Sequence, residues 1–163
     1  MNYTTLAVPN DVIYIAATNK GLCYVGNEEQ ELFDYAAKRK EVLVQDNEAM
    51  LDYRTQFARY FSGNLESFHL TLDVTGTALQ QQVWQTLMTI PFGEVWTYSD
   101  VAEKIGKPTA VRAVANAIGR NPVLVVIPCH RVIGKNRKLT GFRSGLAMKK
   151  TLLHLEGFTA YKE

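Results

Sequence analysis

Cysteine, histidine and arginine stand side by side in Pro128–Val132, the segment with the clearest chemical potential in this sequence. It follows directly after Val123–Ile127, a run of five apolar residues that we expect to be buried. The thiolate is the reactive form of cysteine, and a neighbouring base or positive charge favours it. Cys129 is therefore a candidate nucleophile and His130 its candidate base. For an isolated Cys-His pair, however, a packed and unreactive cysteine is the commoner outcome.

Glu156 is a candidate partner for this pair, because it lies near the end of an amphipathic segment that begins around Leu146. We expect a helix there that ends just before Gly157. A carboxylate at a helix C-terminus opposes the helix dipole, and a misfit of that sign points to a functional demand. A carboxylate can orient an imidazole and raise its basicity. We therefore expect Glu156 to orient His130, and the two together to lower the pKa of Cys129.

A helix-turn-helix pattern precedes the reactive segment. Residues 97–106 favour a short helix, because Thr97 and Asp100 have the spacing of a capping box and a glycine follows the last helical residues. Pro108 suits the first turn of a second helix that runs to about Ile118. Two short helices joined by a tight glycine turn are typical of DNA-binding proteins.

The second of these helices is expected to have two different faces. Its core-facing side carries apolar residues at helical spacing, namely Val111, Val114, Ala115 and Ile118. The other side carries small and polar residues with a single arginine, namely Thr109, Arg112, Ala113 and Asn116. Small side chains let a helix backbone approach DNA closely, and a protruding arginine can fill the space left by an extruded base. An ordinary alanine-rich helix with a solvated Arg112 is the alternative.

The rest of the chain points to an α+β fold in two domains. The first domain, residues 1–76, is expected to be a small α/β unit with antiparallel strands. A hairpin is expected from Val12–Ala17 and Leu22–Val25, and two further strands at Val42–Val44 and His69–Leu72. Two helices are expected at residues 28–39 and Asn47–Phe61, the second of them capped by Asn47. The second domain, residues 77–163, is expected to be mainly helical and to begin with a helix opened by Thr77. The junction at residues 73–76 is short, so we expect the two domains to pack together.

Charge is divided unevenly along the chain. Residues 1–76 carry 6 basic and 11 acidic side chains, a net −5, whereas residues 77–163 carry 12 basic and 5 acidic, a net +7. Such asymmetry suggests that the second half meets a polyanion, although chance segregation on a solvated surface is an equal alternative. No run approaches the roughly 18 apolar residues of a membrane span, and the first residues lack the pattern of a signal peptide. We therefore expect a cytoplasmic, nucleoid-associated protein without a membrane partner.

Disulfide and metal chemistry are poorly supported. The sequence has two cysteines, Cys23 and Cys129, which should both be free thiols in a reducing compartment. Its three histidines form no spacing typical of zinc ligands with either cysteine. We expect neither a bound metal nor a cofactor.

The reactive segment and its surroundings resemble the DNA 6-O-alkylguanine alkyltransferases, also called methylated-DNA–protein-cysteine methyltransferases. The resemblance rests on several motifs in family order over residues 77–163, about half of the chain. They are Pro128–Val132, Phe92-Gly93-Glu94-Val95, Thr97-Tyr98, Arg112-Ala113-Val114, Arg120-Asn121-Pro122, Leu152-Leu153 and Glu156-Gly157. Some members carry a structural zinc in the N-terminal domain, but Cys23 and His69 are the only such ligands here, so we expect none. One branch of the family lacks the acceptor cysteine and only binds lesions, whereas this chain keeps Cys129.

The resemblance implies a role for each matching residue. Cys129 would accept the alkyl group, and His130 would act as base through a bound water. Glu156 would orient the His130 imidazole. Asn121 would brace the connection between the active-site segment and the second helix of the helix-turn-helix, the recognition helix. Tyr98 would help drive the nucleotide out of the duplex and assist proton transfer. The residues expected to contact DNA in the minor groove are Arg112, Thr109, Ala113, Asn116, Arg120 and Arg131. The loop Gly141–Gly145 would wall the base pocket, and the residues expected to form the pocket are Tyr98, Val132, Phe142, Arg143 and Ser144.

The implied function is direct-reversal repair. Cys129 would take the methyl group of 6-O-methylguanine irreversibly and once per protein molecule, with 4-O-methylthymine as a second candidate substrate. Alkylated double-stranded DNA would be the partner, and no obligate protein partner is expected. Two alternatives stay open. A helix-turn-helix regulator or lesion-sensing binder would need the basic half but not Cys129. A redox sensor would need the thiol but not DNA.

Overall fold

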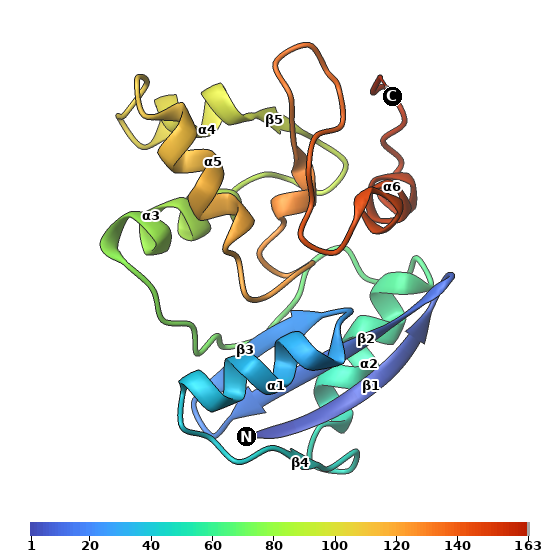
Figure 1. The fold of residues 1–163 in the computed structure, drawn as a ribbon. Helices are drawn as coiled ribbons and strands as arrows, with labels where there is room; N and C mark the ends of the chain where they lie inside the picture. The colour runs from blue at the N-terminus through green and yellow to red at the C-terminus, as the bar shows by residue number, and fades with distance from the viewer. Residues whose placement is uncertain (163) are drawn as a thin grey trace. The chain divides into compact units, whose positions relative to one another are not determined.

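The computed structural model describes residues 1–162, and Glu163, the last residue of the expected second domain, lies outside them. The chain forms two compact units, Met1–Val74 and the residues from Thr75 onward. Figure 1 shows the long strands in the first unit and most of the helices in the second. This mixture confirms the expected α+β class.

A four-stranded sheet in the order β3-β2-β1-β4 forms the centre of the first unit. β1 (Asn2–Val8) pairs antiparallel with β2 (Asp11–Thr18), and β2 pairs antiparallel with β3 (Gly21–Gly26), so the predicted hairpin is present. β4 (Val44–Gln45) is a short edge strand parallel to β1, and it starts where the predicted strand Val42–Val44 ends. β1 was not predicted at all.

Two helices bury this sheet. In the view of Figure 1, α1 (Glu29–Lys38) lies in front of the strands and α2 (Leu51–Phe61) lies behind them. Every residue of β3 is buried, and α1 packs against this strand, whereas α2 packs against β1. Leu32 from α1 and Phe57 from α2 are both completely buried in the core.

Two expectations for the first unit are wrong. Asn47 does not cap α2, which begins only at Leu51. Its Oδ1 instead accepts a hydrogen bond from Thr4 Oγ1 at 2.7 Å, which ties the segment before α2 to β1. The strand expected at His69–Leu72 is reduced to a single bridge with Leu22.

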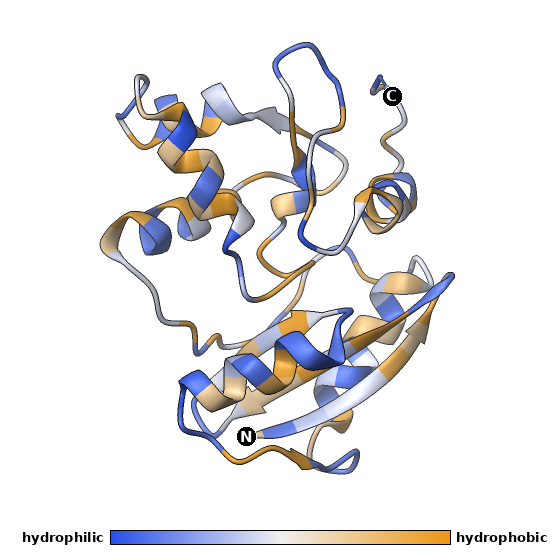
Figure 2. Ribbon diagram, viewed as in Figure 1, coloured by the Kyte–Doolittle hydropathy of each residue, from blue (hydrophilic) through white to orange (hydrophobic). Residues whose placement is uncertain are grey.

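Three helices pack together in the second unit, namely α3 (Ala78–Leu87), α4 (Tyr98–Lys104) and α5 (Val111–Gly119). Thr77 opens α3 and Thr97 opens α4, each with a complete capping box, as the sequence predicted for Thr97. α4, a glycine turn and α5 form the helix-turn-helix. Figure 2 shows hydrophilic and hydrophobic residues alternating around α5, as expected for a helix with one face in the core.

α5 begins three residues later than predicted. Ala110 N donates a hydrogen bond to Lys107 O at 2.9 Å, so the chain makes a turn first and Thr109 lies in that turn. Ala115, predicted to face the core, is only half-buried. The buried residues of the helix are Val114, Ala117 and Ile118.

The remaining elements surround the reactive segment. η1 (Cys129–Arg131) is a single 3-10 turn, and β6 (Val132–Ile133), which follows it, pairs parallel with β5 (Trp96–Thr97). α6 (Leu146–Leu155) packs beside η1. Within residues 1–162, no helix has both the length and the apolar character needed to cross a membrane.

Candidate active site

Asn121 fixes the loop that carries the reactive cysteine. Its Nδ2 donates hydrogen bonds to Ile127 O at 2.8 Å and to Cys129 Sγ at 3.2 Å, and its Oδ1 accepts one from Val123 N at 2.9 Å. Within this loop Val125 has a φ of +74°, a conformation that is costly for a β-branched residue. Such strain persists only where the surrounding contacts hold the backbone, and Asn121 supplies two of them, to Ile127 O and Val123 N.

Glu156 is the shared acceptor of a buried network. Its Oε2 accepts hydrogen bonds from His130 Nε2 at 2.7 Å and from Arg131 Nη2 at 3.0 Å, and its Oε1 accepts one from Arg131 Nε at 2.7 Å. Arg131 Nη1 donates to Ile90 O at 2.6 Å. The guanidinium therefore balances the carboxylate charge at the end of α6, and gives Glu156 a structural role that the sequence did not reveal.

His130 is a neutral imidazole in this network. Burial lowers its pKa, and the hydrogen bond to Glu156 opposes that effect. Because Glu156 is an acceptor, Nε2 carries the proton and Nδ1 carries the lone pair. Nδ1 is buried and has no hydrogen-bond partner among residues 1–162. His130 is therefore able to accept a proton at Nδ1.

The thiol of Cys129 has a raised pKa. Burial is the main cause, and it outweighs the hydrogen bond from Asn121 and the positive charges of Arg143 and Lys149. The expectation that His130 and Glu156 together lower this pKa is wrong. A neutral imidazole supplies no positive charge to stabilise the thiolate.

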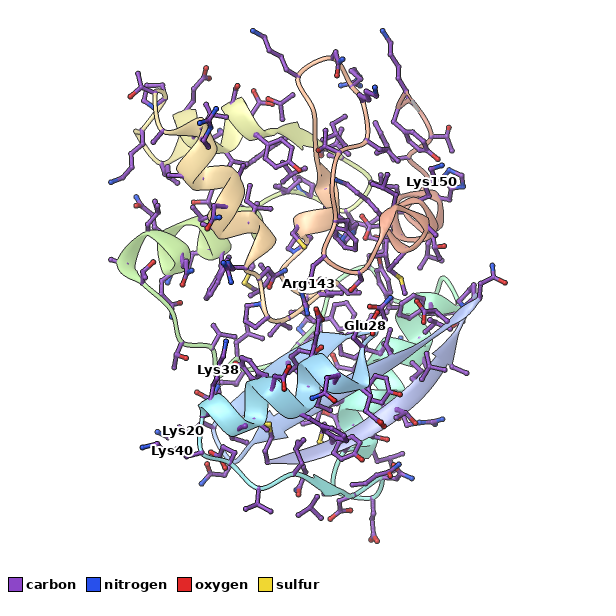
Figure 3. The ribbon with its side chains drawn as sticks, viewed as in Figure 1. Lys20, Glu28, Lys38, Lys40, Arg143 and Lys150 are labelled. Atoms are coloured by element: carbon purple, nitrogen blue, oxygen red, sulfur yellow. The ribbon has the colours of Figure 1, made fainter. Side chains whose placement is uncertain are left out.

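A cavity of about 50 Å³ opens beside Cys129 between two walls. α5 and the residues after it form one wall, and the segment that leads into α6 forms the other. Arg143, labelled in Figure 3, extends from this second segment. The lining residues that the sequence predicted for the site are Tyr98, Asn121, Cys129, Gly141, Phe142 and Arg143. Ala115, Ile118 and Gly119 also line the cavity, and the sequence did not assign them to the pocket.

Tyr98 presents a protonated phenol to this cavity. Its hydroxyl is hydrogen-bonded to Thr140 Oγ1 at 2.9 Å. Burial raises the pKa of Tyr98, and the hydrogen bond to Thr140 opposes the shift. The phenol is therefore a proton donor at neutral pH.

Lys149 is a site residue that the sequence interpretation missed. It is 1 % exposed, its Nζ donates to Thr140 O at 3.4 Å, and it lies 5.8 Å from the centre of the Phe142 ring. Burial lowers the pKa of Lys149 to about 8, and the interaction with the charge of Cys129 opposes this shift. The available signal was its spacing, because Lys149 lies on the same helical stripe as the buried residues Leu152, Leu153 and Glu156.

Five of the six residues expected to contact DNA are exposed on or beside α5. Arg112, Ala113 and Asn116 lie on the exposed face of the helix, Thr109 precedes it and Arg120 follows it. They belong to the same segment as Ala115, Ile118 and Gly119, which line the cavity.

Arg131, Val132 and Ser144 do not lie where the sequence predicted. Arg131 is 8 % exposed and its guanidinium is held by Glu156 and Ile90, so it is not available to a phosphate. Val132 is completely buried in β6. Ser144 is half-buried and lies one residue beyond the cavity lining. A residue next to the reactive cysteine in sequence is thus not necessarily next to the substrate.

Cys23 belongs to a different environment from Cys129. It is completely buried in the first unit, its Sγ lies 3.4 Å from Ala16 O, and burial raises its pKa to about 12. Such a thiol is unreactive at neutral pH. Among residues 1–162, no three His, Cys, Asp or Glu side chains are grouped so that they could hold a metal ion.

Both halves of the chain match known family descriptions. Residues 78–158 match "6-O-methylguanine DNA methyltransferase, DNA binding domain", and residues 1–74 match "6-O-methylguanine DNA methyltransferase, ribonuclease-like domain". The first match contains the helix-turn-helix, the cavity and the His130–Glu156–Arg131 network described above.

Known relatives cover nearly the whole chain. It is 47 % identical over 148 residues to the inducible methylated-DNA–protein-cysteine methyltransferase of Bacillus subtilis, which spans 88 % of this chain and 83 % of that protein. It is 42 % identical over 160 residues to the methylated-DNA–protein-cysteine methyltransferase of Methanosarcina acetivorans, and the match covers 96 % of this chain and 99 % of that protein. The crystal structure of Mycobacterium tuberculosis OGT in complex with DNA has a TM-score of 0.82 at 37 % identity, over 96 % of this chain and 92 % of that one. The chain belongs to the 6-O-methylguanine DNA methyltransferase family.

Proposed function

We propose that this protein repairs alkylated DNA by direct reversal, and that Cys129 accepts the alkyl group of 6-O-methylguanine in double-stranded DNA. The observation that carries the proposal is the position of the Cys129 thiol, which lines a cavity whose other wall is the second helix of a helix-turn-helix. A base extruded from a duplex bound at α5 would enter this cavity and meet the sulfur.

The proposed reaction is a displacement at the alkyl carbon. The thiol proton passes to Nδ1 of His130, directly or through a water molecule, while the hydrogen bond from Nε2 to Glu156 supports the developing imidazolium. The sulfur forms a bond to the methyl carbon as the bond between that carbon and the guanine oxygen breaks, and the electron pair of the broken bond goes to guanine. Tyr98 is the proton donor to the departing base and regains its proton from the imidazolium, so the thiol proton ends on guanine.

The product on Cys129 is a thioether, which no group lining the cavity is able to reverse. Each protein molecule therefore repairs one lesion. The reaction uses the protein's own thiol and no cofactor.

The proposed DNA surface is the exposed face of α5, placed in the minor groove. Arg112 fills the position that the extruded base leaves, and the small residues Ala113 and Asn116 let the helix approach the duplex. We place the protein on nucleoid DNA in the cytoplasm. We also propose that residues 1–76 and 77–163 are the functional domains, and that DNA binding and transfer both belong to the second.

Two single substitutions test the assignment. Cys129→Ser should abolish methyl transfer from a 6-O-methylguanine duplex and keep affinity for that duplex, because the serine replaces one buried atom and leaves the exposed face of α5 unchanged. The matched control Cys23→Ser should transfer at the wild-type rate, because Cys23 is buried in the other unit. Transfer by the Cys129 variant, or its loss in the Cys23 variant, would refute the assignment.

A further inference from the structure

A basic turn projects from the second unit between β6 and the cavity wall. Figure 1 shows this loop, between β6 and α6, standing clear of the helices, and Figure 2 shows its tip as hydrophilic. Lys135, Asn136, Arg137 and Lys138 are all exposed. Lys135, Arg137 and Lys138 form no ion pair with any of residues 1–162, so three positive charges stand together without a described counter-charge.

Arg137 occupies a backbone conformation that favours glycine. Its φ is +65°, in the left-handed region that is costly for side chains other than glycine, asparagine and aspartate. The turn is closed by hydrogen bonds from Gly134 N to Lys138 O and from Arg137 N to Gly134 O, both 2.9 Å. The left-handed residue that closes a short hairpin loop is typically glycine. This chain has Arg137 at that position, although glycine would adopt the conformation at lower cost.

The turn is held in place by the C-terminal segment. Leu139 N donates to Lys162 O at 3.1 Å and Lys162 N donates to Arg137 O at 2.8 Å. The guanidinium carbon of Arg137 lies 5.8 Å from the centre of the Phe158 ring. The positive charges are therefore carried on an ordered structure, which reduces the conformational entropy lost when they bind a partner.

The position of the turn relates it to the cavity. The chain runs from Lys138 through Thr140 directly into Gly141, Phe142 and Arg143, which form the cavity wall that faces the α5 wall. A duplex that placed a base in the cavity would lie against α5 on one side and near this turn on the other.

We propose that the basic turn Lys135–Lys138 is a second phosphate-binding surface, which contacts the DNA backbone beyond the reach of α5, and that Arg137 keeps its strained backbone because its charge is needed there. This inference rests on the proposed function, since it assumes that DNA enters at the cavity. Cations that neutralise phosphates release counter-ions, so their contribution falls as salt increases.

The test substitutes Arg137→Gly, which removes the charge and relieves the backbone together. Its matched control is Lys40→Gly, because Lys40 is also exposed, has a φ of +57° and lies in the turn after α1 of the other unit, as labelled in Figure 3. Both variants should have an unchanged or higher Tm. Affinity for an undamaged fluorescent duplex is measured by anisotropy between about 50 and 200 mM salt.

Arg137→Gly should bind roughly five- to tenfold more weakly at about 0.1 M salt, and the slope of log affinity against log salt should be shallower by about 1. Lys40→Gly should match the wild type in its affinity for the duplex and in its salt slope. An Arg137 variant that binds like the wild type, or equal losses in the two variants, would overturn the inference. The proposed function is tested separately in the same samples, because both variants should still carry one methyl group per molecule after saturation with methylated duplex. Absence of methyl on the wild-type protein would mean that the proposed function itself fails.

Discussion

Among the site residues, Glu156 is the one for which the structure changes the sequence interpretation most. Its position at a helix C-terminus suggested a carboxylate kept only for catalysis, but it accepts three buried hydrogen bonds from His130 and Arg131. In the proposed reaction the same group orients the base, and its hydrogen bonds also hold the 3-10 turn that carries the thiol. Catalysis and local folding share one side chain.

Glu156→Gln should consequently affect stability as well as transfer. The amide keeps one acceptor oxygen but places an NH₂ group against the buried donors, so Arg131 is left as an uncompensated buried charge. Breaking a buried pair in this way costs about 3–5 kcal/mol of unfolding free energy. Urea denaturation measures that loss, and transfer assayed well below the Tm should also be slower. Wild-type stability in this variant would show that Arg131 does not depend on Glu156.

Asn121→Ala should raise the pKa of Cys129 further. The amide of Asn121 donates the hydrogen bond that opposes burial, at 3.2 Å from the sulfur, and alanine donates none. The rate of thiol alkylation by iodoacetamide against pH reports the thiolate fraction, with Cys23→Ser as the background in both proteins. A pH profile that stays in place, or moves to lower pH, would contradict this role for Asn121.

The chemical residues could be predicted because their types and neighbours are informative. Cys129 and His130 are adjacent in sequence, and Glu156 was indicated by its position near the C-terminus of an amphipathic helix. The partners of these residues could not be predicted. Arg131 turns away from the cavity to Glu156 and Ile90, and Lys149 is buried beneath Phe142, and both arrangements depend on tertiary packing.

At the scale of elements, the threonines that open α3 and α4 were reliable signals, whereas the single cap predicted at Asn47 was wrong. Thr77 and Thr97 open their helices with complete capping boxes. α5 begins at Val111 without a side-chain cap, and a proline three residues earlier gave a misleading start. β1 has no turn signal before it. The strand is stabilised by its antiparallel pairing with β2, and the sequence of one strand alone does not reveal its partner. These are cases in which tertiary contacts override local preference.

Arg112→Ala tests the role of the recognition helix. It should slow repair of methylated duplex DNA by at least about tenfold, and leave the reaction with the free base 6-O-benzylguanine unchanged, because a free base needs no extrusion and an intercalating arginine is irrelevant to it. Both reactions are quenched at a series of times, and the fraction of alkylated protein gives the rate with the duplex and the rate with the free base. Equal slowing with the two substrates would show that Arg112 supports the fold or the cavity instead.

At the scale of the whole molecule, the site lowers stability. A buried ammonium lies against Phe142 of the cavity wall, since Lys149 is 1 % exposed and burial lowers its pKa to about 8 from an ordinary 10.5. The unfolded chain binds more protons than the folded chain between these two values, so unfolding free energy should rise with pH across that interval. Below pH 8 both states are protonated, and the full penalty of burying the charge is present.

Lys149→Met should therefore stabilise the protein at pH 7, by up to about 3 kcal/mol, because methionine has a similar length and no charge to bury. The gain over the wild type should shrink as pH rises from 8 to 10.5, where the wild-type lysine loses its proton. Urea denaturation of both proteins at a series of pH values measures this difference, in which other titrating groups cancel. A destabilised variant at pH 7 would show that the ammonium is satisfied by its contacts with Thr140 and Phe142.

The most direct test of the central claim is the intact mass of the wild-type protein after incubation with an excess of duplex that contains 6-O-methylguanine. Every molecule should gain one methyl group and no more, peptide mapping should place it on Cys129, and the amount of repaired DNA should stop at one equivalent of protein. No methyl on the protein, methyl on Cys23, or repair that continues beyond one equivalent would contradict the claim that Cys129 is the acceptor in a single, irreversible transfer.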